Sequence, residues 1–191
     1  PIIDTLEQDV YPFIIGLMNV AIHPDKPIDL DRNSILSNIQ SIILVQLKDE
    51  VESLFLYEKR LVFPSIRNTY TANNVTDEFI PDIVAIKKLI THKEEKIRQQ
   101  VSALDASIVK LITNNEKALI DSDTERALIK LSNYFEKDFF PARAVWGSLL
   151  DDLQNSHKDQ KSSPCKRQVR VKFSRHVPVK WNYPYCITEP P

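Results

Sequence analysis

Residues 36–64 read LSNIQSIILVQLKDEVESLFLYEKRLVFP, and this stretch decides the fold class. Its apolar side chains recur at steps of three, four and seven residues, which places them on one face of a helix. They are Leu36, Ile39, Ile43, Leu47, Val51, Leu54 and Leu61. The sequence therefore predicts a long amphipathic helix, over about residues 31–62, with one buried apolar stripe.

Three further stretches carry helical patterns, at about residues 4–23, 82–113 and 122–153. Pro12 must kink the first of these helices or lie near its start. The pair Ser122 and Glu125 has the spacing of a capping box and predicts the start of the last helix. Four such helices with moderate connections predict a mainly α fold, an up-down-up-down four-helix bundle.

Composition narrows the classes of function. The chain of 191 residues has only two glycines, Gly16 and Gly147, and they lie far apart. Phosphate-binding loops and dinucleotide fingerprints need several glycines at short spacing, so these classes are excluded. A content of 42% hydrophobic and 27% charged residues is typical of a globular protein. Because no apolar run is long enough to span a membrane, we predict a cytoplasmic protein with no membrane partner.

The C-terminal segment differs in charge and pattern from the rest. Residues 158–191 hold eight Lys and Arg against two acidic residues, a charge of +6, which leaves −7 for residues 1–157. Val169, Val171 and Phe173 alternate with polar residues, as in a strand. We therefore predict two parts, a bundle at 1–157 and a basic β-hairpin or extended tail at 158–191 that packs on it. The tail's two cysteines, Cys165 and Cys186, leave open whether a disulfide closes it.

Glu58 is the first candidate for a functional site. It lies four residues beyond Leu54 and seven beyond Val51, so it continues the buried stripe. A buried carboxylate is costly unless it is paired or binds a metal, and helical bundles build iron and manganese sites from inward carboxylates and histidines. The alternative is that the helix frays here and the carboxylate reaches solvent.

The segment around Glu58 also resembles a known motif. Residues 54–64 are similar to the second-helix motif of the hemerythrin-like family, His-x3-Glu-x4-Phe-Pro, with Leu54 at the histidine position. Residues 20–23, which end in His23, resemble the end of that family's first helix. Asp4 stands where the family commonly has another histidine, eight residues before Pro12.

The later helices match the family only in part. Glu94 takes the place of the family's third-helix histidine, with His92 two residues away as its substitute. In the last helix the motif falls on residues 131–141 and both ligand positions are apolar, at Leu131 and Phe135. The resemblance implies a hemerythrin-like bundle, whose usual activities are di-iron oxygen or nitric-oxide chemistry and iron–sulfur repair. The metal ligands that it implies are Asp4, His23, Glu58 and Glu94, or His92 in place of Glu94.

Because most ligands are replaced, we predict a bundle without catalytic residues and without a cofactor. Its predicted function is protein interaction or sensing, with a protein partner or self-association. One alternative is a reduced site for iron or another divalent metal around Glu58. A second is nucleic-acid binding through the basic tail, where aromatic side chains stand near lysines and arginines.

Overall fold

Four long helices make up the described part of the chain. The computed structural model describes residues 2–24, 33–72, 79–116 and 120–162. We number the helices 1 to 4 in chain order, and three of them contain π-helical turns. Helix 1 consists of α1 (Ile2–Thr5), the π turn η1 (Leu6–Val10) and α2 (Tyr11–Ile22). Helix 2 consists of α3 (Ile35–Asn38), η2 (Ile39–Ile43), α4 (Leu44–Tyr57), η3 (Glu58–Val62) and α5 (Phe63–Ala72). Helix 3 is α6 (Phe79–Thr113), and helix 4 consists of α7 (Ser122–Tyr134), η5 (Phe135–Phe139) and α8 (Phe140–Ser162).

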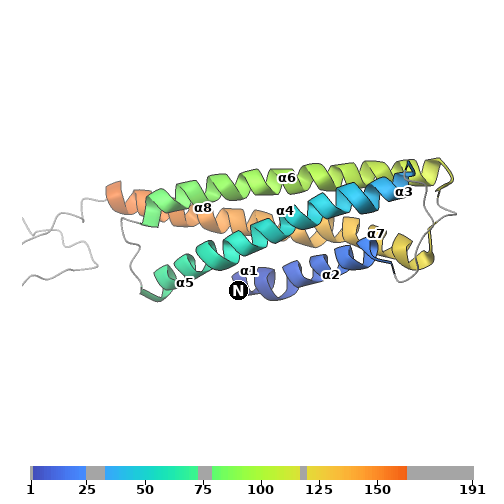
Figure 1. Cartoon of the computed structure of the whole chain (residues 1–191). Helices are drawn as coiled ribbons and strands as arrows, with labels where there is room; N and C mark the ends of the chain where they lie inside the picture. Colours follow the sequence, from blue (N-terminus) through green and yellow to red (C-terminus); the bar gives the residue numbers. More distant parts are fainter. Residues whose placement is uncertain (1, 25–32, 73–78, 117–119, 163–191) are drawn as a thin grey trace, which may run out of the picture.

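The helices run alternately in opposite directions, so the described chain is an up-down-up-down bundle (Figure 1). Neighbours in sequence are neighbours in space: α2 packs along α4, α4 along α6, and α6 along α8. The contact of α7 with α2 closes the ring. The predicted mainly α bundle is therefore confirmed. Among the described helices, none combines the length and the apolar content needed to cross a membrane.

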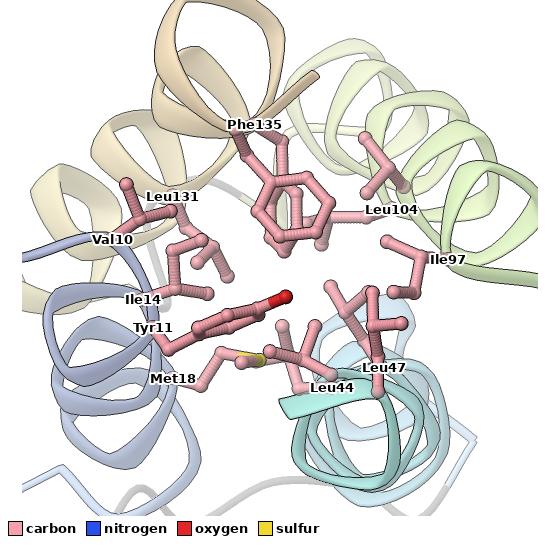
Figure 2. Close-up of a cluster of buried hydrophobic side chains, with 14 of the residues drawn as sticks. Val10, Tyr11, Ile14, Met18, Leu44, Leu47, Ile97, Leu104, Leu131 and Phe135 are labelled. Atoms are coloured by element: carbon pink, nitrogen blue, oxygen red, sulfur yellow. The ribbon is translucent and has the colours of Figure 1, made fainter. Parts of the chain in front are cut away.

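The core lies along the axis of this bundle. Figure 2 shows side chains from all four helices pointing toward a common centre. Those labelled are Val10, Tyr11, Ile14, Met18, Leu44, Leu47, Ile97, Leu104, Leu131 and Phe135, and all are buried. The removal of this apolar surface from water is the main force that holds the helices together.

The prediction that Leu61 belongs to the buried stripe of helix 2 is wrong. Leu61 is 59% exposed, whereas its neighbour Val62 is fully buried. The cause is the π turn η3, which inserts one extra residue and rotates the rest of the helix by that amount. The predicted positions are therefore buried from Leu36 to Glu58, and the stripe is displaced by one position beyond Glu58.

Four prolines lie within the described helices, and three of them directly follow an aromatic residue that closes a π turn, whereas Pro81 lies in the first turn of α6. The amides of Tyr11 and Phe63 donate to carbonyls five residues back, and so does the amide of Phe140. Pro12, Pro64 and Pro141 follow these residues. A proline inside an α-helix collides with the carbonyl four residues earlier and leaves it without a donor. The wider π turn accommodates the ring, so helix 1 continues through Pro12.

The start of helix 4 differs from the prediction by one residue. Its N-cap is Asp121, whose carboxylate accepts from the amides of Asp123 and Thr124 at 3.0 and 2.7 Å. Ser122 is the first helical residue instead. Aspartate and serine are both good N-caps, and the earlier of the two takes the position here.

Asp121→Ala is expected to lower the free energy of unfolding by about 1 kcal/mol, the usual effect of losing an N-cap. Ser122→Ala is the matched control and is expected to change it by less than about 0.5 kcal/mol. Urea unfolding followed by circular dichroism measures both. A larger loss for the Ser122 variant would show that the capping box predicted from the sequence operates in solution.

The predicted boundary of the tail is also displaced. Helix 4 continues to Ser162, so residues 158–162, which we predicted as the start of the tail, belong to α8. The described residues contain no strand. The positions that predicted one, Val169, Val171 and Phe173, lie outside the described residues, as do both cysteines.

Candidate functional site

A cluster of four polar side chains lies in the apolar core, one from each helix. Tyr11 is the first residue of α2, Glu58 the first residue of η3, Glu94 lies in α6 and Arg143 in α8. We call this group the Arg143 cluster. The side chains of Tyr11, Glu58 and Arg143 are at most 1% exposed, and that of Glu94 is 20% exposed. The cluster therefore joins all four helices at one level of the bundle.

Arg143 is the hub of the cluster. Its Nη1 lies 2.6 Å from Glu58 Oε1 and donates to the hydroxyl of Tyr11 at 3.0 Å. Its Nε donates to Glu94 Oε1 at 2.7 Å, and Nη2 lies 2.6 Å from that same oxygen. One guanidinium thus contacts two carboxylates on different helices. Charge-assisted hydrogen bonds of this kind are about twice as strong as neutral ones.

Tyr11 links helix 1 to the other partners. Its hydroxyl donates to Glu58 Oε1 at 3.0 Å while it accepts from Arg143. The ring packs against Phe55 and Phe139, with centroid distances of 4.8 and 6.3 Å. A buried hydroxyl needs such partners, because leaving it without them costs free energy. Figure 2 shows its oxygen directed toward the bundle centre.

Local helix geometry helps to place these groups. Tyr11 directly follows η1, Glu58 opens η3, and Arg143 lies four residues after η5 ends. Each π turn shifts the residues beyond it by one position on the helix face. Since π turns occur often at functional sites, their repetition around one cluster sets this level of the bundle apart from an ordinary apolar core.

Burial controls the ionisation of the cluster. Burial raises the pKa of Glu58 above its ordinary value, although the charge of Arg143 and the hydrogen bonds from Arg143 and Tyr11 oppose the shift. Burial also raises the pKa of Tyr11 well above its usual range. For Arg143, burial acts to lower the pKa, but the charges of Glu58, Tyr11 and Glu94 and the hydrogen bond to Glu58 together outweigh it and hold the pKa above its usual range. Arg143 is therefore a permanent cation at the centre.

The raised pKa of Glu58 predicts a pH dependence of stability. From the ordinary pKa of 4.5 up to the raised value, the folded chain holds a proton that the unfolded chain has released. Stability therefore falls as the pH rises through this window and levels off above it. We expect this fall in urea unfolding of the wild type, and expect it to be absent from Glu58→Gln. A wild-type stability that instead rises with pH, relative to that variant, would mean that Arg143 outweighs burial.

The structure brings together only two of the ligands implied by the resemblance. Glu58 is buried, as its place on the stripe predicted, and Glu94 shares Arg143 with it. His92 is exposed, two residues from Glu94. The part of the chain that the structure describes holds no group of three or more His, Cys, Asp or Glu side chains suited to hold a metal ion.

The other two implied ligands lie elsewhere. Asp4 is bound at the surface by Arg67, whose Nη2 is 3.2 Å from its Oδ1 and 2.8 Å from Glu7 Oε2. His23 is exposed at the C-terminal end of α2, where its amide donates to Asn19. It lies twelve residues beyond Tyr11, about 18 Å along the helix. Neither side chain reaches the Arg143 cluster.

Sequence reasoning missed Arg143 and Tyr11. Arg143 obeys the rule that identified Glu58. Arg143 lies four residues after the buried Phe139 and three before the buried Trp146, so it continues the apolar stripe of helix 4. The signal was a charged residue on the buried stripe of each of two helices, Glu58 in helix 2 and Arg143 in helix 4. Because their charges are opposite, the two residues form a natural ion pair.

Comparison of the chain with protein-family models, with curated proteins and with solved structures gives no match. The fold and the site nevertheless define a class: a four-helix bundle with a buried, arginine-centred ion cluster.

Proposed function

We propose that this chain is a non-catalytic helical-bundle domain that acts in protein interaction or sensing, with a guanidinium at its centre where the hemerythrin-like resemblance implies metal. The observation that carries the proposal is Arg143, whose side chain is 1% exposed and contacts Glu58 and Glu94. Both carboxylates that a metal would need already serve this cation. A divalent ion would have to displace the guanidinium and would then meet its positive charge.

The donor set does not fit the iron centre that the resemblance implies. The resemblance implies a histidine and a glutamate from each of helices 2 and 4, in the motif His-x3-Glu, with further histidines from helices 1 and 3. Here two glutamates and a tyrosine surround the centre, and helix 4 contributes the arginine itself. The same burial argues against acid–base chemistry at Glu58, because a fully buried carboxylate offers no access to a substrate.

The outer surface supports the interaction part of the proposal. Apolar side chains at the C-terminal end of α6, just before α7 and along α7 line a hollow, together with Glu125. They are Ile108, Leu111, Ile112, Ile120, Leu128 and Ile129. Ile112 is 51% exposed and Ile129 43%, and Val109 nearby in sequence is 62% exposed. Ile112 and Ile129 are thus the exposed apolar side chains of this hollow, and grouped exposed apolar side chains often mark contacts between proteins.

Metal titration tests the proposal. We expect the urea midpoint of the full chain to be the same with a chelator and with excess Fe²⁺, Mn²⁺ or Zn²⁺, because a ligand raises stability only if it binds the folded state. A midpoint that rises with metal and loses this rise in Glu58→Gln would overturn the proposal in favour of the reduced metal site. A rise that persists in this variant would show that the ion binds away from Glu58, and the proposal that Arg143 occupies the centre of the bundle would stand.

A further inference from the structure

Three buried polar atoms at the centre of the bundle have no hydrogen-bond partner among the described residues. They are Glu58 Oε2, Arg143 Nη2 and Trp146 Nε1. Nη2 lies at ion-pair distance from Glu94 Oε1, but none of its N–H bonds points along a hydrogen bond to a described residue. Each buried polar atom without a partner costs free energy, so three in one core require an explanation.

The three atoms belong to two adjacent layers of the same pair of helices. In the first layer, Arg143 of helix 4 contacts Glu58 of helix 2 at 2.6 Å. In the second, the ring of Trp146 packs edge-to-face on Phe63, with centroids 5.6 Å apart. Trp146 lies three residues after Arg143, about 4.5 Å along helix 4. Phe63 closes the π turn that begins at Glu58. The side chains that carry the unpaired atoms therefore lie within about one helical turn of one another on helices 2 and 4.

The hydrogen-bonding capacity of the three unpaired atoms indicates which kind of molecule can bind to all of them. The indole N–H of Trp146 and the Nη2 of Arg143 only donate, whereas the carboxylate oxygen of Glu58 accepts. A bound anion would be repelled by Glu58, and a bound cation would be repelled by Arg143 and could not accept from Trp146. One water molecule can accept twice and donate once, and buried waters typically make about three hydrogen bonds. The complement of the three atoms is thus a single water.

We infer that the bundle binds one structural water molecule, which accepts from Trp146 Nε1 and Arg143 Nη2 and donates to Glu58 Oε2. This water extends the Arg143 cluster by one layer and ties Trp146 into it. It also gives Glu58 a partner on each carboxylate oxygen. The inference is independent of the proposed function, since a water of this kind fits the cluster whatever the outside of the bundle binds.

Crystallography of the full chain tests the inference directly. We expect an electron-density peak about 2.7–3.2 Å from each of the three atoms. In Trp146→Phe, which keeps the ring but removes the donor, we expect the peak to weaken or vanish while the Arg143–Glu58 contact persists. Direct donation from Trp146 Nε1 to Glu58 Oε2, with no peak between them, would overturn the inference.

Nuclear magnetic resonance gives a second readout in solution. The chain has two tryptophans, so Trp181→Phe leaves Trp146 as the only source of an indole N–H signal. We expect a cross-peak between this signal and a long-lived water. An indole signal protected from exchange and without a water cross-peak would also overturn the inference.

Discussion

Arg143→Met is expected to lower the free energy of unfolding by about 3–5 kcal/mol, the usual cost of removing one partner from a buried ion pair. Methionine fills similar space but leaves the carboxylate of Glu58, which is fully buried, without its cation. Glu94 is partly exposed and turns to solvent at smaller cost. Urea unfolding of the wild type and the variant at neutral pH measures the difference.

A surface arginine provides the control. Arg126 is 71% exposed and pairs with Asp123 at 3.6 Å within the first turns of α7. Exposed pairs of this kind contribute little, so we expect Arg126→Met to change the free energy of unfolding by less than about 0.5 kcal/mol. Equal effects of the two substitutions would show that Arg143 is not buried in solution.

Glu58→Leu is expected to destabilise the fold by a similar amount, about 3–5 kcal/mol. The substitution leaves the Arg143 guanidinium, 1% exposed, without its fully buried anion and removes the acceptor of the Tyr11 hydroxyl. A glutamate that was buried but unpaired would give the opposite sign, because leucine would then relieve the cost of the lone carboxylate. The sign of the change therefore distinguishes a paired Glu58 from an unpaired one.

Glu52→Leu is the matched control for this experiment. Glu52 lies in α4 on the same helix and is 43% exposed, with Lys48 4.0 Å away. We expect a change of less than about 0.5 kcal/mol for this variant. Stabilisation by Glu58→Leu would contradict the pairing of Glu58 with Arg143.

Most of the fold follows from apolar periodicity. The stripe from Leu36 to Leu54 predicted the face that helix 2 buries, and four such helices predicted the bundle. The failure at Leu61 has a local cause, because a π turn adds a residue that a fixed α-helical period does not contain. The aromatic–proline pairs were a usable signal for these turns, since each marks the place where an α-helix would reject a proline.

The candidate site was predicted only in part. Glu58 was found because a carboxylate on an apolar stripe stands out, and the same argument applied to helix 4 finds Arg143. The resemblance to a metal-binding motif directed attention to acids and histidines and away from arginine. His23 matches the family pattern in sequence and Asp4 stands at one of its histidine positions, but both lie away from the cluster, which a match of spacing within single helices does not reveal.

The most direct test of the central claim, that Arg143 with its partners forms one energetically coupled unit at the centre of the bundle, is the stability of a triple variant. Tyr11→Phe, Glu58→Leu and Arg143→Met together replace three buried members of the cluster by apolar side chains of similar size. Replacing a whole buried ion cluster in this way is often neutral or stabilising, although breaking it is costly. We therefore expect the free energy of unfolding of the triple variant to be at least about 2 kcal/mol higher than that of either Arg143→Met or Glu58→Leu. A triple variant as unstable as the sum of its single substitutions would contradict the claim, because independent residues add their effects.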